Sequence, residues 1–167
     1  MAFFTKRKVE RRKDGTFAVN ISADEREMLA NFLQQLRDLL LSDDPLLKRL
    51  FPPAYVDDAD RESDYQALMR GDLLESRFAA IEVMEATLGE DQLDEAAVTQ
   101  WMQSINALRL VVGTSLDVSE DPAPPDPDDP DYGMRVLYEV LGWLLADITR
   151  ALSSGLPPPT GDDFAPG

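Results

Sequence analysis

Four stretches of the chain repeat apolar residues at three- and four-residue steps, which is the spacing of a helix with one apolar face. Ser22 and Glu25 precede the first stretch with the spacing of a capping box, and Asp94 is the expected N-cap of the third. Gly71 lies within the second stretch and marks either a bend or a break. The pattern predicts a mainly α protein, a single compact helical bundle, with helices over residues 23–42, 60–88, 95–116 and 134–152.

The first 21 residues follow a different pattern, which is typical of a β-hairpin. Apolar residues alternate with small or polar ones over residues 17–21, and Asp14-Gly15 provides a tight turn. A two-stranded hairpin is only marginally stable alone in water, so we expect its apolar face to lie on the helices. We therefore interpret residues 1–21 as a small N-terminal β-hairpin, an appendage of one domain that spans residues 1–156.

Proline and acidic residues mark the connecting segments. Pro45 begins a short helix that must end at Pro52 and Pro53, because proline lacks an amide donor and restricts the residue before it. Residues 117–131 contain seven acids, five prolines and no basic residue, a composition that cannot bury enough apolar surface to fold. We predict an acidic, proline-rich mobile loop at 117–131 and a disordered tail at 157–167.

The composition excludes several classes of chemistry. The 167 residues include no cysteine and no histidine, which removes disulfides, thiolate nucleophiles, Ser-His catalysis and zinc sites built from thiolate or imidazole. No long uncharged apolar run is present, and no apolar segment of signal-peptide length follows the basic N-terminus. We therefore expect a cytoplasmic protein that is not an enzyme, holds no cofactor or metal, and does not contact membranes.

Charge is unevenly distributed. The net charge is −16, yet residues 1–13 hold six Lys or Arg against one Glu, so this basic arm carries +5 and the remainder carries −21. The side chains of Lys6, Arg7, Lys8, Arg11 and Arg12 are able to contact nucleic-acid phosphates, but lysine and arginine also protect exposed strand edges from pairing. The acidic remainder repels phosphates, so we favour the edge-protecting role and expect no nucleic-acid partner.

Arg109 is the most unusual residue of the third predicted helix, because it falls within an apolar stripe. Burying an unpaired guanidinium is prohibitive, so the side chain needs an oxygen partner. Glu85 occupies a similarly apolar stripe on the preceding helix and is the first candidate for an ion pair, with Glu82 second. The alternative is that Arg109 and nearby Asn106 line a cleft and receive a carboxylate, such as a peptide terminus.

The acidic stretch "YVDDADRESD" holds five carboxylates, the ligand type that magnesium and calcium prefer. Counted from Asp57, a calcium loop needs glycine at its sixth position and glutamate at its twelfth, and neither is present. The better explanation is that these acids, Asp58 among them, interact favourably with the positive end of the following helix. We therefore predict no metal site here.

Two motifs, "RLFPPAYVDD" at residues 49–58 and "WMQSINALRLVVGTSL" at residues 101–116, resemble an actinobacterial family of unknown function, the domain of unknown function numbered two thousand and seventeen. The resemblance covers nearly the whole chain. It implies an all-helical cytoplasmic protein, often encoded beside the ClpS-type adaptor of the Clp protease, with some members labelled as transcriptional regulators. It provides no catalytic residues. Where members tend to carry a second arginine after the Gly-Thr pair, this chain has Ser115. The family pattern falls on Pro52, Pro53, Tyr55, Asp58, Trp101, Asn106, Arg109, Leu110 and Gly113.

These observations favour a non-enzymatic protein-binding or adaptor-like module, linked to regulated proteolysis and acting on an unidentified protein partner. The alternative hypothesis is a DNA-binding transcriptional regulator that uses the basic arm. The candidate structural or partner-binding residues are Arg109, Glu85, Asn106, Tyr55, Asp58 and Trp101.

Overall fold

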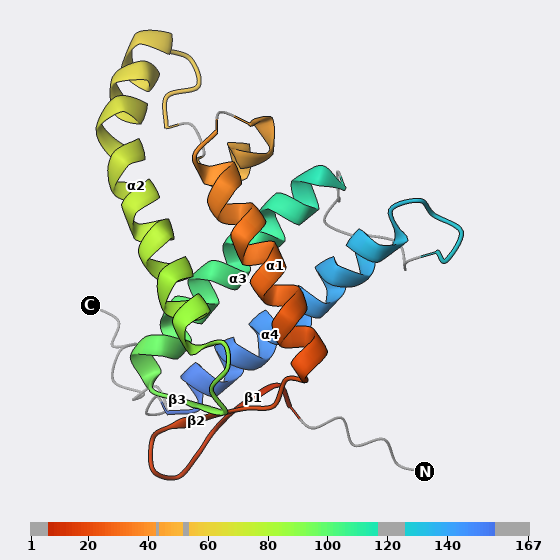
Figure 1. Cartoon of the computed structure of the whole chain (residues 1–167). Coiled ribbons are helices and arrows are strands. Elements are labelled where there is room, and N and C mark those ends of the chain that lie inside the picture. The colour runs from red at the N-terminus through yellow and green to blue at the C-terminus, as the bar shows by residue number, and fades with distance from the viewer. Residues whose placement is uncertain (1–6, 43, 52–53, 117–125, 156–167) are drawn as a thin grey trace, which may run out of the picture.

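The protein is mainly helical, with a small antiparallel sheet at one end (Figure 1). A computed structural model describes residues 7–42, 44–51, 54–116 and 126–155. Within these residues the helices are α1 (Ala23–Leu40), α2 (Ala59–Thr87), α3 (Glu95–Ser115) and α4 (Tyr132–Ser153), and η1 (Pro45–Arg49) is a short 3-10 helix. The strands are β1 (Val9–Arg11), β2 (Phe17–Val19) and β3 (Gln92–Leu93). The predicted fold class is confirmed.

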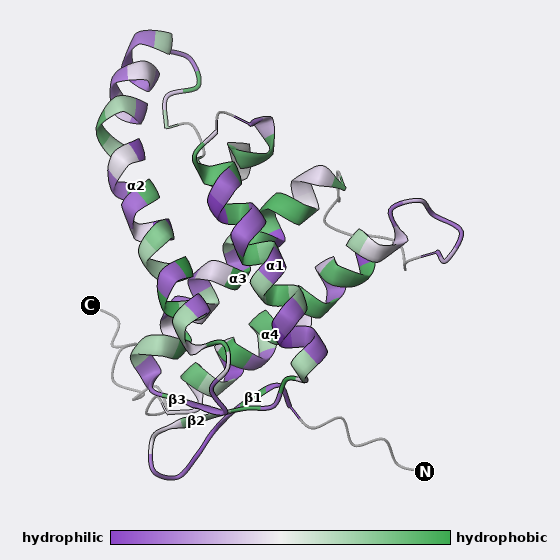
Figure 2. Cartoon of the chain, viewed as in Figure 1, coloured by the Kyte–Doolittle hydropathy of each residue, from purple (hydrophilic) through white to green (hydrophobic). Residues whose placement is uncertain are grey.

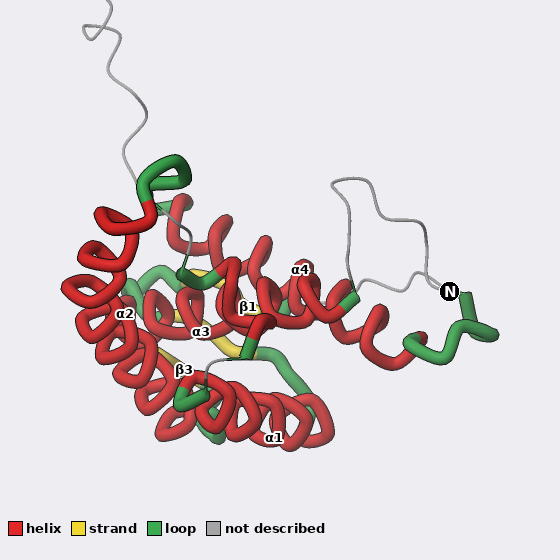
Figure 3. The backbone as a smooth tube through the Cα atoms, turned by 90° about the horizontal axis from the view of Figure 1, so that it is seen from above, coloured by secondary structure: helices red, strands yellow, loops and turns green. Residues whose placement is uncertain are grey.

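Helix α3 is the central element, because it contacts α1, α2, α4 and η1. The view from above shows α2 and α4 on either side of it (Figure 3). Its predicted apolar stripe is buried, including Trp101 and Ile105, which are wholly inaccessible. Hydrophobic residues run along α3 and α4, and hydrophilic ones gather on the outer turns of α1 and on the loop before α4 (Figure 2). The tertiary packing therefore follows the periodicity of the sequence.

The sheet closes the end of the bundle and has one more strand than predicted. The hairpin is present, with β1 and β2 antiparallel and Gly15 in the turn at φ +85°. Strand β3 also pairs with β2, placing Leu93 opposite Phe17. A two-residue strand is too short to show alternation, so the sequence pattern did not reveal it. The third strand ties the α2–α3 connection to the hairpin.

Most predicted helix boundaries are confirmed. Ser22 and Glu25 form the capping box of α1, and Asp94 caps α3. The alternative of a break at Gly71 is wrong, because α2 runs through it without interruption. Residues 126–131 form turns that are exposed except at half-buried Asp129, whereas residues 117–125 of the predicted loop and the predicted tail 157–167 lie outside the described residues. Within the described chain, no helix combines the length and the apolar character needed to cross a membrane.

Candidate functional site

Arg109 lies against α4 and makes no ion pair with Glu85. Its Cζ atom is 4.6 Å from the centre of the Tyr138 ring, and a Cβ built on Gly142 would lie 3.4 Å from its Nε. The side chain is half-buried, and its buried Nε has no hydrogen-bond partner among the described residues. The predicted Arg109–Glu85 ion pair is therefore wrong, and so is the pairing with Glu82, because no ion pair of the described chain includes Arg109.

Glu85 pairs with α1 instead. Its Oε2 lies 2.9 Å from the NH2 nitrogen of Arg37, and each side chain of the pair is 32% exposed. The second oxygen, Oε1, is buried without a partner in the described structure. Helical phase placed Glu85 and Arg109 on the core sides of their helices, where the structure leaves both half-buried instead of mostly buried. A helix between two neighbours has two inward sides. The phase alone does not say which neighbour each side chain meets.

Trp101 and Asn106 have different surroundings. The indole of Trp101 is wholly buried, and its Nε1 donates to Thr87 Oγ1 at 2.7 Å, which joins α3 to the end of α2. Trp101 is therefore a structural residue in this chain. Asn106 is half-buried, one turn before Arg109 on the same helix. The structure thus keeps Asn106 and Arg109 near each other, as the carboxylate-binding alternative requires.

The acidic stretch before α2 organises the start of that helix. Asp58 is the N-cap and accepts from the Arg61 backbone N–H at 3.1 Å, as the helix-start interpretation predicts. Glu62 accepts from the backbone N–H groups of Ala54 and Tyr55. Hydrogen bonds from Gln66 and from the Tyr55 backbone lower the pKa of Glu62, so it remains ionised. These acids hold the loop against the helix, and Tyr55 is left 43% exposed at its tip.

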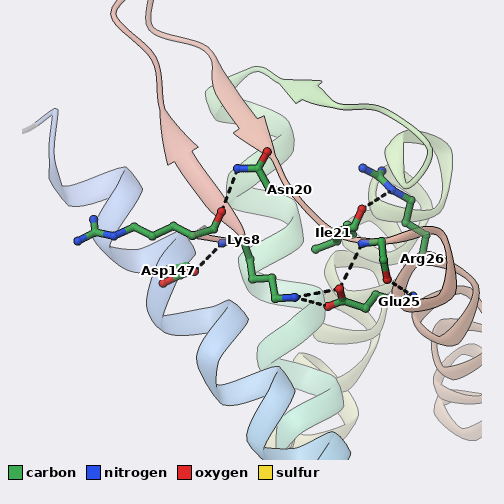
Figure 4. A network of polar contacts seen from close by, with 8 residues as sticks. Lys8, Asn20, Ile21, Glu25, Arg26 and Asp147 are labelled. Atoms are coloured by element: carbon green, nitrogen blue, oxygen red, sulfur yellow. Dashed lines mark hydrogen bonds and ion pairs between the residues drawn. The ribbon is translucent and has the colours of Figure 1, made fainter. Parts of the chain in front are cut away.

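Two cations of the basic arm, Lys8 and Arg11, bind other parts of the protein, and Figure 4 shows the contacts of Lys8. Lys8 Nζ binds both carboxylate oxygens of Glu25, and its backbone N–H donates to Asp147 at 2.8 Å. Arg11 donates to the carbonyls of Ala151 and Leu152, so it caps the negative C-terminal end of α4. These contacts attach the hairpin to α1 and α4. The remaining described arm cations, Arg7, Arg12 and Lys13, are exposed.

Arg26 is an important residue that sequence reasoning missed. Its guanidinium donates to the carbonyls of Ile21, Leu88 and Glu90 and binds the Asp91 carboxylate. It therefore joins the start of α1 to the α2–β3 turn, and Figure 4 shows its bond to Ile21. The sequence pattern predicts that an arginine in the first turn of an amphipathic helix lies on the surface. Its carbonyl partners could not be predicted, because every residue has a backbone carbonyl.

The N-terminal part of α2 is the most exposed regular element. Residues 59–79 contain no fully buried side chain, whereas Ala80, Ile81 and Met84 further along the helix are buried. Leu68 is 77% exposed and Met69 is exposed beside it. Figure 1 shows these turns at the end of the molecule farthest from the sheet. We call residues 59–79 the α2 arm.

The side-chain clusters and the apolar cavity of the described residues offer few groups for catalysis. No group of three or more His, Cys, Asp or Glu side chains within the described residues is arranged to hold a metal ion. An apolar cavity of about 200 Å³ lies between α1, η1, α3 and the start of α4, with polar groups only from Gln35 and Ser115. A lining of this kind suits packing or an apolar ligand and offers no acid–base pair.

Comparison with known proteins supports the earlier resemblance. Residues 6–152 match the family model described as "Domain of unknown function (DUF2017)". The chain is also 29% identical over 119 residues, 61% of its length, to a Mycobacterium leprae (strain TN) protein named "Putative oxidative stress regulator AosR". It spans about half of that relative, 54% of its length. No solved structure matches the chain significantly.

Proposed function

The chain belongs to the DUF2017 family, and we propose that it is a non-enzymatic, cytoplasmic protein-binding module whose partner docks on the α2 arm. The observation that carries this proposal is that residues 59–79 contain no fully buried side chain. At 1.5 Å per residue, this helical segment is about 30 Å long. Helices in water are stabilised chiefly by burying an apolar face, so a segment of this length gains from covering one.

The surface chemistry of α2 suits a protein partner. Leu68 and Met69 offer apolar contact area, and the nearby loop adds Val56, which is 83% exposed. The α2 arm that carries them holds five acids and three arginines, a net charge of −2. An apolar centre with a charged rim is typical of protein interfaces. The negative rim favours a partner with basic residues around an apolar anchor.

The relative's name and the family resemblance suggest a setting for this binding. A regulator is able to act through protein contacts alone, and an adaptor in regulated proteolysis does the same. The chain contains no cysteine, so a thiol switch would have to lie outside these 167 residues. We therefore propose that the module transmits regulation by binding, with no redox chemistry at a thiol of its own.

Crosslinking tests the proposal with a closely matched control. A photoreactive amino acid replaces Leu68 in one variant and Leu41, an equally exposed leucine directly after α1, in another. We expect a discrete protein adduct at position 68 in cells that make the protein, lost when Met69→Glu is added, and none at position 41. Equal labelling at both positions, or no adduct at position 68, would count against the α2 arm.

A DNA-binding regulator is the second candidate, because Arg7, Arg12 and Lys13 remain exposed near the hairpin. Lys8 and Arg11 are engaged within the fold, which leaves fewer cations for phosphates. A gel shift separates the two proposals. Salt-sensitive duplex binding that disappears in the Arg7→Gln/Arg12→Gln/Lys13→Gln variant would favour the regulator, whereas we expect no binding at moderate salt.

A further inference from the structure

Arg109 presents an organised hydrogen-bonding edge that contacts no oxygen of the described chain. One face of its guanidinium lies on Tyr138, with 4.6 Å between Cζ and the ring centre. The Nε atom is buried beside Gly142 and has no partner within the described chain, whereas the two terminal nitrogens are accessible. None of the three guanidinium nitrogens bonds to an oxygen of the described chain. The stacked face fixes the plane of the group, and the terminal N–H groups remain open.

Four other half-buried arginines of this protein bind protein oxygens, whereas Arg77, like Arg109, binds none within the described chain. Arg37 and Arg135 bind carboxylates at 2.9 and 2.8 Å, while Arg11 and Arg26 bind backbone carbonyls. Partly buried guanidinium groups need such partners because desolvation is costly. Arg109 differs from these four in lacking oxygen contacts within the described chain, and it differs from Arg77 in having its guanidinium against an aromatic ring. A guanidinium held in one plane with N–H groups that contact no protein oxygen is suited to an oxygen ligand from outside the described chain.

The charge around Arg109 does not oppose an anion, although the whole chain carries −16. Between Ala96 and Leu116, Arg109 is the single charged residue. Helices α3 and α4 together hold three arginines and three acids, so their net charge is zero. Of the acids on α4, Asp147 is engaged by Lys8 and Arg150, and Glu139 is exposed. An acidic group is therefore able to approach this part of the surface without the repulsion that the total charge implies.

We propose that Arg109, held by Tyr138 and Gly142 at the α3–α4 crossing, is a binding site for a single carboxylate. The terminal N–H groups match the two oxygens of a planar carboxylate in a bidentate geometry. Arg135, one turn before Tyr138 on α4, is already bound to Asp129, so the site offers one positive charge and suits a monoanion better than a phosphate. Half-buried Asn106, one turn away, is a second polar group within the same region.

The Arg109 site is distinct from the α2 arm, so either proposal can be refuted without affecting the other.

The carboxylate ligand has two possible sources, an acidic group of a peptide or a small organic acid. The protein, labelled with 15N, is titrated with sodium acetate against sodium chloride at equal ionic strength. The reporters are the Gly142 amide and the Arg109 side-chain Nε–H. Two capped peptides follow, one whose only carboxylate is a glutamate side chain and one whose only carboxylate is its C-terminus.

We expect acetate to shift both signals saturably and chloride to leave them unchanged. Arg109→Gln should abolish the Gly142 response, and Tyr138→Leu should weaken acetate binding about two- to fivefold through loss of the cation–π contact. Arg150→Gln, an exposed arginine on α4, and Leu68→Glu on the α2 arm should leave the response unchanged. Binding of either peptide at least tenfold tighter than acetate identifies a peptide source, and equal binding identifies a small acid.

Half-buried Arg77 provides an internal comparison, because it has no oxygen partner within the described chain and no aromatic ring against it there. Its side-chain signal should show no saturable shift with acetate. The proposal is overturned if the Arg109 and Gly142 signals do not respond saturably to acetate or to either peptide. It is also overturned if Arg109→Gln leaves the Gly142 response intact.

Discussion

The ion pair between Arg37 and Glu85 makes the arrangement of α1, α2 and α3 testable by stability measurements. Removing Arg37 leaves a carboxylate whose Oε1 is already buried without a partner in the described structure. Breaking a fully buried pair costs about 3 to 5 kcal/mol, and an exposed pair contributes about 0.2 to 1 kcal/mol. Each side chain here is 32% exposed, so we expect a coupling free energy of about 1 to 2 kcal/mol, between these limits.

A double-mutant cycle measures this coupling directly. Urea unfolding of the wild type, Arg37→Ala, Glu85→Ala and the double variant gives four free energies of unfolding, and the coupling is their non-additive part. Arg37→Ala alone should lose about 2 kcal/mol and, at about 2 to 4 °C per kcal/mol, lower the melting temperature by about 4 to 8 °C. The matched cycle replaces Arg37→Ala with Arg109→Ala. Because Arg109 contacts Tyr138 on α4, its effect should add to that of Glu85→Ala within about 0.5 kcal/mol.

The comparison of the two cycles decides between the packing described here and the pairing that helical phase alone suggests. A larger coupling for Arg109 and Glu85 than for Arg37 and Glu85 would refute the assignment of Glu85 to α1. It would also remove the basis for a carboxylate site at Arg109, because the guanidinium would then have an internal partner.

Three further predictions concern the contacts that attach the hairpin and the helix ends. Arg26→Ala should lower the free energy of unfolding by about 2 to 3 kcal/mol, because it removes charge-assisted bonds to partly buried carbonyls. The control Arg61→Ala, at a 72% exposed position, should change it by less than about 0.5 kcal/mol. Urea unfolding measures both variants, and equal losses would contradict the role of Arg26. Burial raises the pKa of Glu25, but bonds from Lys8 and the Ser22 backbone outweigh it and hold the pKa below its ordinary value. The resulting stabilisation is present above the ordinary pKa of 4.5 and is lost as the pH falls through the lowered folded-state pKa. Lys8→Met should therefore flatten the acid side of the curve of stability against pH. An unchanged slope would contradict this prediction. Gly15→Ala should cost about 1 kcal/mol in thermal unfolding, because φ is +85°, and no loss would show that the turn adapts.

Local structure was predictable because its causes lie within a few residues of sequence. The capping box needs only Ser22 and Glu25, three positions apart, and the cap of α3 needs only Asp94. The helical stripes likewise depend on steps of three and four residues, and Leu29, Leu33, Leu36 and Leu40 are all buried as that spacing requires. The hairpin follows from the turn at Asp14-Gly15 and the alternation over residues 17–21.

The sequence predicted the inward placement of Arg109 and Glu85 but not their partners. Helical phase placed Arg109 and Glu85 among buried neighbours, and both are half-buried. Their partners depend on which helices meet, and that choice arises from the packing of all the helices together. The same holds for Lys8 and Arg11, whose charges suggested a basic arm for phosphates or a protected strand edge. In the fold they bind Glu25 on α1 and the C-terminal carbonyls of α4, more than a hundred residues away in the second case.

The sequence by itself determined the helical class, the hairpin, the helix starts and the absence of cysteine and histidine, because each depends on composition or on short-range spacing. The tertiary structure decided the third strand, the anchoring by Arg26, the exposure of the α2 arm and the partnership of Arg109 with Tyr138. These features depend on which residues distant along the chain come together and which remain uncovered. Their energies depend on orientation and burial, which become defined only when the helices pack against one another.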